Sequence, residues 1–339
     1  IFISKFGPHD TLSDWERIQK ECLAKGIKLE EIAFSTLQNM SQTLRDNHWE
    51  VRVVYKKNKV IQLLPTKSPI YGIALDIGST KIAAYWVDMQ NGSILYQAGF
   101  MNPQISLGED VVNRIAYANQ SQNHQDQLQN KLIQSINDHT QEICKKLRIE
   151  KEQIVDMVVV GNSVIHHLFC GISVRSLGEA PYTPVFKEPI EVKATDLKLD
   201  ISPGAEIYLP PLIAGYVGAD HTAALIATRF RNMSETTCLI DVGTNTEISL
   251  IHNQKIYSCS CASGPAFEGA HIHDGMRAAP GAIDQVKIIN NEIQFSTIMQ
   301  KEPVGICGSG ILSAIAEMSR NKIIDHRGVF QEPRTGFHA

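Results

Sequence analysis

Two short runs in the sequence combine an acid, glycine and hydroxyl residues in a way that could bind phosphate. The first is Asp76-Ile77-Gly78-Ser79-Thr80-Lys81, which follows one buried-strand pattern and leads into another. Glycine lets a backbone turn tightly and approach a ligand, while hydroxyl groups add to the N–H donors of such a turn. The carboxylate of Asp76 could hold a hydrated Mg²⁺. This run therefore predicts a β-hairpin whose turn cradles phosphate.

The second run, Asp241-Val242-Gly243-Thr244-Asn245, repeats this order 165 positions later (241 minus 76), again between two strand patterns. A single Asp-x-Gly turn is explained equally well by an ordinary hairpin, because short motifs match by chance. The recurrence favours a nucleotide held by both runs. We therefore predict two halves that clamp one nucleotide between them.

Two glycine-rich stretches past the second run each precede a helical pattern. They contain Gly264 and Glu268 in the first case and Gly308, Ser309 and Gly310 in the second. Helix N-termini present free N–H groups and a positive dipole end, which suit phosphate. Either stretch alone is as compatible with an ordinary turn as with a phosphate site.

Histidines and cysteines give no strong indication of a metal. His166 and His167 are expected to be packing or hydrogen-bonding residues, because adjacent residues point to different sides of a helix. His271 and His273 are expected to be structural, because they have no further ligands nearby. The seven cysteines lack any Cys-x-x-Cys spacing, so neither a disulfide framework nor an iron–sulfur site is indicated. Cys259 and Cys261 fall on one face of a strand, where we expect small buried core residues.

The elements that must position these runs divide the chain into three segments. Residues 1–67 predict a small α+β domain, with a helix that starts after Ser13 and ends near Gly26. A second helix is expected from Leu29 to about Arg45, and residues 49–55 and 60–64 read as a hairpin.

Residues 68–225 and 226–339 carry one phosphate run each. Between the two phosphate runs, the apolar pattern predicts a long amphipathic helix that ends near Leu147 and a buried strand at residues 154–160. Glu109, Asp110 and Arg114 are interpreted as charges that suit a helix dipole. The fold class is α/β.

Composition excludes several function classes. The chain has 339 residues, 43% hydrophobic and 20% charged, with a formal net charge of −4. Without a long basic run, nucleic acid is not expected as a partner. No apolar run approaches the ~20 residues of a membrane span, and no signal pattern opens the chain, so we expect a cytoplasmic protein without membrane contact.

The paired runs resemble those of the actin, heat-shock chaperone and sugar-kinase superfamily, in which two related subdomains each offer a phosphate hairpin to ATP. The resemblance implies an actin-like ATPase fold with a cleft. Sugar kinases carry their catalytic base at an aspartate like Asp220, in the small-residue run 214–225.

Five further motifs narrow the resemblance. They are Gly108-Glu109-Asp110-Val111, Leu209-Pro210-Pro211-Leu212-Ile213-Ala214-Gly215, Ser263-Gly264-Pro265-Ala266-Phe267-Glu268-Gly269, Gly275-Met276-Arg277-Ala278 and Gly305-Ile306-Cys307-Gly308-Ser309-Gly310. In this order they resemble the reductive activators of corrinoid-dependent methyltransferases. That family couples ATP hydrolysis to the reduction of a Co(II) corrinoid protein to Co(I). Its members begin with a 2Fe-2S ferredoxin domain, whose cysteine spacing is missing from this sequence, and they continue beyond the point that corresponds to Ala339.

The resemblance implies roles for the matching residues. Asp76 and Asp241 would hold Mg²⁺ and act in catalysis. The ATP-binding candidates are Gly78, Ser79, Thr80, Lys81, Gly243, Thr244, Asn245, Gly264, Glu268, Gly308, Ser309 and Gly310. The implied partners are a corrinoid protein and an electron donor that acts through the ferredoxin-like domain.

Ser263 is a separate candidate. A Co(II) corrinoid is harder to reduce while a good axial ligand stabilises it, so an activator gains by presenting a weaker ligand. The hydroxyl of Ser263 could serve as that ligand, although capping the following helix is the simpler role.

Two other functions stay open. The chain could be a small-molecule kinase with Asp220 as base, or a filament-forming actin-like protein without enzymatic activity. The oligomeric state is also open, with a homodimer as one option.

Overall fold

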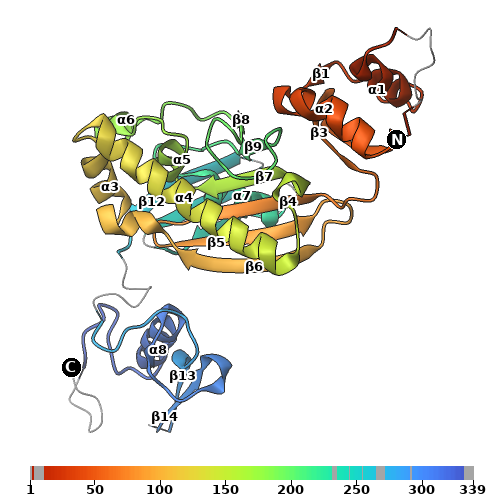
Figure 1. Ribbon diagram of the computed structural model, residues 1–339. Coiled ribbons are helices and arrows are strands. Elements are labelled where there is room, and N and C mark those ends of the chain that lie inside the picture. The colour runs from red at the N-terminus through yellow and green to blue at the C-terminus, as the bar shows by residue number, and fades with distance from the viewer. Residues whose placement is uncertain are drawn as a thin grey trace. The chain divides into compact units, whose positions relative to one another are not determined.

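The computed structural model describes residues 2–3, 11–230, 235–243, 245–253, 255–264, 272–290 and 292–331 (Figure 1). By its internal contacts the chain divides into two compact units, Ile1–Phe230 and Arg231–Ala339. Residue 226, where the sequence predicts the third segment to begin, lies in the last turn of helix α7 (Ala219–Ala227).

The N-terminal region, residues 11–65, forms a small α+β layer. Its elements are α1 (Asp14–Leu23), β1 (Glu31–Ile32), α2 (Phe34–Asp46), β2 (Val51–Lys56) and β3 (Lys59–Pro65). The strands pair in the order β1-β3-β2, and both helices pack their apolar sides on a core that includes Ile18, Leu44 and Val60.

The predicted first helix and hairpin of this region are confirmed, but the start of the second helix is wrong. Ser13 and Glu16 form the expected capping box, with Ser13 N–H donating to Glu16 Oε2 at 2.7 Å. The second helix begins at Phe34 because Glu31 and Ile32 pair in parallel with β3. This strand pairing joins residues almost thirty positions apart, so no local sequence pattern predicts it.

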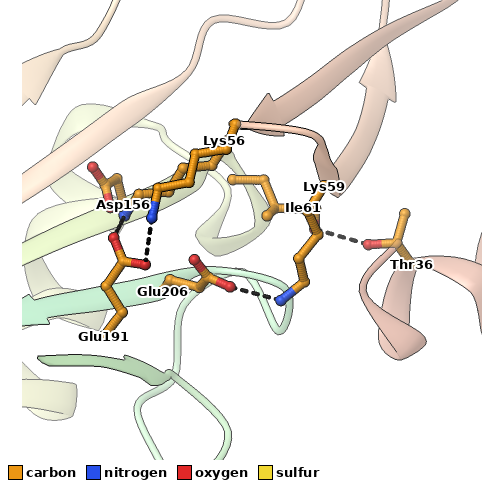
Figure 2. Close-up of polar contacts among 8 residues, drawn as sticks. Thr36, Lys56, Lys59, Ile61, Asp156, Glu191 and Glu206 are labelled. Atoms are coloured by element: carbon orange, nitrogen blue, oxygen red, sulfur yellow. Dashed lines mark hydrogen bonds and ion pairs between the residues drawn. The ribbon is translucent and has the colours of Figure 1, made fainter. Parts of the chain in front are cut away.

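Lysines of the β2–β3 hairpin attach the N-terminal region to the large sheet of the first unit (Figure 2). Lys59 Nζ lies 2.6 Å from Glu206 Oε1, and Lys56 Nζ lies 3.4 Å from Asp156 Oδ1 and 3.3 Å from Glu191 Oε1. Burial alone would lower the pKa of Lys56, but the two carboxylates outweigh it and raise that pKa. These acids lie on β7 (Ile154–Gly161), β8 (Ile190–Lys193) and β9 (Glu206–Leu209), near the amino ends of the parallel strands β7 and β9.

That large sheet has six strands in the order β6-β5-β4-β7-β9-β8. Strands β4 (Tyr71–Ile77), β7 and β9 run parallel, while β5 (Lys81–Asp88) and β6 (Ile94–Met101) continue from β4 as antiparallel neighbours. The predicted first hairpin is thus confirmed as β4–β5. Because β4 and β7 are parallel, their carboxyl ends lie at one edge, where Ile77 pairs with Gly161.

Helices cover this sheet and build a second core beside it. The long helix α4 (Gln122–Leu147), confirmed as predicted, lies along one face of the sheet (Figure 1). Its residues Leu132, Ile136 and Ile143 belong to one core cluster with sheet residues. The remaining helices are α3 (Val111–Ala118), α5 (Ser163–Phe169) and α6 (Arg175–Gly178), with short 3-10 turns η1 (Pro103–Leu107) and η2 (Lys151–Gln153). Helices α3, α4, α5 and α6 share a separate apolar cluster.

The second unit contains two three-stranded sheets. One is β10 (Thr237–Asp241), β11 (Asn245–His252) and β12 (Lys255–Ala262), which confirms the predicted second hairpin. The other is β13 (Ala282–Ile289), β14 (Glu292–Thr297) and β15 (Gly305–Ile306), and it is followed by α8 (Gly308–Arg320). A short turn, η5 (Ile298–Gln300), follows β14.

The prediction that Cys259 and Cys261 are buried is wrong, because both are exposed on β12. The half-buried face of that sheet is polar instead: Ser249 and Ser258 hydroxyls meet at 2.6 Å, and Ser260 donates to Glu247. Over the part of the chain that the structure describes, no helix has the length and apolarity needed to cross a membrane.

Candidate functional site

Strand alternation places Asp76 beside the turn of the first hairpin. Ile73, Leu75 and Ile77 of β4 point into the core, so Asp76 faces the opposite side and is exposed. Its cross-strand partner is Ala83, whose small side chain leaves room beside the carboxylate. Asp76 is therefore an exposed carboxylate next to the glycine turn.

The turn itself requires Gly78. A Cβ at this position would lie 2.7 Å from the carbonyl oxygen of Lys81, which is closer than real Cβ contacts. Gly78, Ser79 and Thr80 are half-exposed and Lys81 is exposed. Within the described residues, no acceptor takes a hydrogen bond from the N–H groups or the hydroxyls of Ser79 and Thr80. These donors remain for a ligand, as in other backbone turns that bind anions.

The carbonyl groups of the same turn are all held from behind by buried donors. Asn102 donates from Nδ2 to the Gly78 carbonyl at 2.8 Å and from its N–H to the Thr80 carbonyl at 2.9 Å. The guanidinium of Arg114 donates from Nη2 to the Ser79 carbonyl. The negative ends of these three carbonyl dipoles are therefore already paired with protein groups. This favours an anion at the N–H and hydroxyl donors of Ser79 and Thr80.

The sequence interpretation of Arg114 as a helix-dipole charge is wrong. Arg114 lies in the middle of α3, its side chain is fully buried, and Asp110 instead caps the helix by accepting from Asn113 N–H at 2.8 Å. Asn102, Gln104 and Arg114 are the supporting residues that sequence reasoning missed. Only the unusual burial of three polar side chains reveals them.

Helix α7 begins at the same edge of the sheet as this turn. Gly218 precedes α7 and approaches Gly161 and Asn162 so closely that a Cβ there would overlap their backbone. Asp220 accepts a hydrogen bond from its neighbour His221 N–H in the first turn of α7. The structure thus brings Asp76 and Asp220 to one edge, through β4, β7 and α7.

His166 and His167 follow β7 and are structural, as predicted. Both are fully buried in α5, where His166 Nε2 lies 3.1 Å from the Val159 carbonyl and His167 Nδ1 lies 2.6 Å from the Ser163 carbonyl. Burial lowers the pKa of His166 to about 4, so this side chain is neutral at physiological pH.

The second hairpin places Asp241 at the end of β10, directly opposite Glu247 on β11. Asp241 is exposed, whereas Glu247 is only 8% exposed and accepts a hydrogen bond from Ser260 Oγ at 3.0 Å. Burial raises the pKa of Glu247, and the charge of Asp241 adds to this shift. Glu247 is not among the predicted site residues, because only the register of β10 and β11 identifies it as the cross-strand partner of Asp241.

The remaining candidates of the second unit are only partly described. Gly243 and Asn245 flank the turn, but Thr244 and Glu268 lie outside the described residues. Ser263 donates from Oγ to Thr246 Oγ1 at 2.6 Å, and Gly264 has a φ of +75°, which glycine adopts without strain.

Gly308, Ser309 and Gly310 form the first turn of α8, as predicted. A Cβ at Gly310 would overlap the Ile283 carbonyl, so this glycine serves the packing of α8 on β13. The Ser309 hydroxyl lies 3.3 Å from Cys307 Sγ.

The donors of the first turn suit an anion, and the structure describes no all-protein metal cage beside them. No group of three or more His, Cys, Asp or Glu side chains gathers among the described residues. Mg²⁺ accepts such a site, because it is usually bound through one or two carboxylates, waters and substrate phosphates. The cysteines described here do not fit a 2Fe-2S cluster, which needs four thiolates.

Family models match the chain along nearly its whole length. The linker region of RACo matches residues 4–68, the middle region of RACo matches residues 71–233, and the C-terminal ASKHA domain of RACo matches residues 235–337.

Individual relatives agree with these models. The corrinoid activation enzyme RamQ of Eubacterium limosum is 36% identical over 302 residues, which cover 88% of this chain and 50% of that protein. A reductase of the Co(II) methylated amine-specific corrinoid protein of Methanosarcina barkeri is 26% identical and covers 76% of this chain and 52% of that protein.

A solved structure, a reductive activator for a corrinoid, iron-sulfur protein, superposes with a TM-score of 0.84 at 32% identity. The match covers 97% of this chain and 54% of that structure. The predicted mixed α/β fold of the ASKHA type is confirmed by this superposition and by the C-terminal family model. The chain spans about half the length of the relatives it matches.

Proposed function

The chain belongs to the RACo family of reductive activators of corrinoid proteins, and from this premise we propose that it couples ATP hydrolysis to the reduction of a Co(II) corrinoid to Co(I). The observation that supports ATP as the ligand is the first hairpin turn. It offers the N–H and hydroxyl groups of Ser79 and Thr80, while its carbonyl groups are held by Asn102 and Arg114.

We assign the phosphate-binding roles to the two hairpins. The turn Gly78-Ser79-Thr80-Lys81 would bind phosphate, and Gly243, Thr244 and Asn245 are proposed for the same role in the second hairpin. The carboxylates of Asp76 and Asp241 would orient the metal and its waters. When bound, Mg²⁺ neutralises the charge that develops on the transferred phosphoryl group.

The remaining nucleotide candidates are Gly264, Glu268, Gly308, Ser309 and Gly310, and they stay predictions. Ser263 also stays a prediction as the weak axial ligand of cobalt. Its hydroxyl donates to Thr246 Oγ1, so a cobalt ligand role would use a lone pair of the Ser263 oxygen.

The reaction needs an electron that this chain does not supply. Co(II) gains one electron to become Co(I), while ATP and water give ADP and phosphate. No group of three or more potential metal ligands gathers among the described residues, and we propose a 2Fe-2S domain like that of the family as the low-potential electron donor.

The kinase function remains an alternative, because Asp220 lies at the same sheet edge as Asp76. A kinase would transfer phosphate to a hydroxyl group, whereas an activator transfers it to water. The two functions therefore differ in the phosphorylated product.

We expect slow release of phosphate from MgATP by the chain, and faster release when a Co(II) corrinoid protein is added. The reason is that a conformational step limits turnover in many enzymes, so a partner that favours the reactive conformation raises the rate. The measurement is phosphate release from γ-labelled ATP, with the label separated into orthophosphate and organic phosphates.

Label in a sugar phosphate, formed only when a hydroxylated metabolite is present, would contradict the activator function and support the kinase. Sedimentation of the protein with MgATP tests the third function, and we expect no pelleted filaments.

A further inference from the structure

A fully buried arginine lies directly behind the first phosphate turn. Arg114 has no exposed surface, and each part of its guanidinium contacts a neutral acceptor. Nη2 donates to the Ser79 carbonyl, Nε donates to the Gly108 carbonyl at 2.9 Å, and Nη1 lies 3.5 Å from Gln104 Oε1.

No carboxylate among the described residues forms an ion pair with this guanidinium, whose hydrogen bonds go to neutral acceptors. The charge of Asp110 offsets only part of the effect of burial on the pKa of Arg114, and the Asp110 carboxylate itself caps α3. Burial lowers the pKa of Arg114 to about 10, which still leaves it charged at neutral pH. Burying a charge without a counter-ion costs free energy, so proteins seldom keep one without compensation.

The neighbouring backbone is shaped to admit this side chain. Gly108 ends η1 next to Arg114, and a Cβ at Gly108 would lie 2.8 Å from Arg114 N and 3.0 Å from its Cγ. Gln104 is also fully buried and donates from Nε2 to the Leu128 carbonyl of α4 at 3.1 Å. Arg114 is therefore fixed between the turn and the helices.

We propose that Arg114 is the positioning residue of the nucleotide site: it holds the Ser79 carbonyl away from the phosphate, and its buried charge is balanced by the phosphate that binds on the other side of the turn. This inference rests on the proposed function, because it takes a phosphate-bearing ligand as the counter-charge. It adds a buried cation behind a turn whose backbone N–H and hydroxyl donors are neutral. A low-dielectric surrounding strengthens such an interaction compared with water.

The test compares Arg114→Gln, which keeps a donor but removes the charge, with Arg114→Lys, which keeps the charge but removes the planar fork. Arg17→Gln is the matched control, because Arg17 is a nearly fully buried arginine of α1 in the N-terminal region. Three quantities are measured for each protein. They are the MgATP affinity by calorimetry, the melting temperature with and without MgATP, and the rate of amide hydrogen exchange in the ligand-free β4–β5 hairpin.

We expect Arg114→Gln to weaken MgATP binding about 10- to 100-fold, the range for a lost charge-assisted hydrogen bond. Arg114→Lys should recover part of that loss, and Arg17→Gln should bind as wild type even where its melting temperature falls equally. Equal affinity of Arg114→Gln and wild type, or an equal loss in Arg17→Gln, would overturn the proposal.

Hydrogen exchange separates this proposal from the proposed function. If the wild-type chain binds no MgATP, the proposed function fails, and the balancing of the charge fails with it. Faster exchange in strands β4 and β5 next to the turn, in both Arg114 variants but not in Arg17→Gln, would still support the positioning of the turn. Unchanged exchange in all three would contradict it.

Discussion

Asp241→Asn is expected to fold normally and to lose ATP turnover by about 10²–10³-fold. The carboxylate is exposed at the end of β10, so the change buries or exposes little apolar surface. It also removes a negative charge opposite the buried Glu247, which relieves repulsion across the strand pair. Loss of one group that positions charge in a transition state costs about 2.7–4 kcal/mol of barrier.

The measurements are kcat for phosphate release and the free energy of unfolding in urea. Asp284→Asn is the matched control, because Asp284 lies on β13, outside the β10–β11 hairpin. Its carboxylate accepts a hydrogen bond from Ser296 Oγ at 2.8 Å. Unfolding free energies of wild type and Asp241→Asn should agree within about 0.5 kcal/mol. Near-normal turnover in Asp241→Asn would contradict the role given to this carboxylate.

Gly78→Ala is expected to reduce ATP turnover about 100-fold. Its Cβ would lie 2.7 Å from the Lys81 carbonyl oxygen, so the turn must shift before the methyl group fits. A displacement of about 1 Å at a reacting group is enough for a loss of this size. The same crowding should lower the free energy of unfolding by about 1–3 kcal/mol.

Gly99→Ala provides the comparison, because a Cβ on Gly99 of β6 would meet no atom within 4 Å. Turnover and urea unfolding are measured for both variants. If Gly78→Ala turned over ATP as fast as Gly99→Ala, the turn would not need the tight backbone that the structure shows, and its role in binding phosphate would be lost.

Sequence reasoning succeeded where local pattern and local geometry agree. The two hairpins follow from strand alternation on both sides of a glycine turn, and α4 follows from apolar residues at helical spacing. The capping box at Ser13 and Glu16 is a contact over three residues, so it too can be predicted from the sequence.

Prediction from the sequence failed where a segment distant in the chain determines the local structure or the contacts of a residue. The helix predicted from Leu29 starts at Phe34 because β3 recruits Glu31 and Ile32 into a sheet. Arg114 was misinterpreted because its partner Ser79 lies 35 positions earlier. Glu247 was missed because a buried acid is recognised only when the register of β10 and β11 is known.

The most direct test of the account is the EPR signal of a corrinoid protein held as Co(II) and mixed with this chain and a low-potential chemical reductant. Co(II) is paramagnetic and Co(I) is not, so loss of the signal measures reduction. We predict rapid loss with MgATP, little loss with ADP or a non-hydrolysable ATP analogue, and little loss with the Asp241→Asn chain. Equal loss of the signal with and without MgATP, or none with any nucleotide while ATP is hydrolysed, would contradict ATP-coupled reduction.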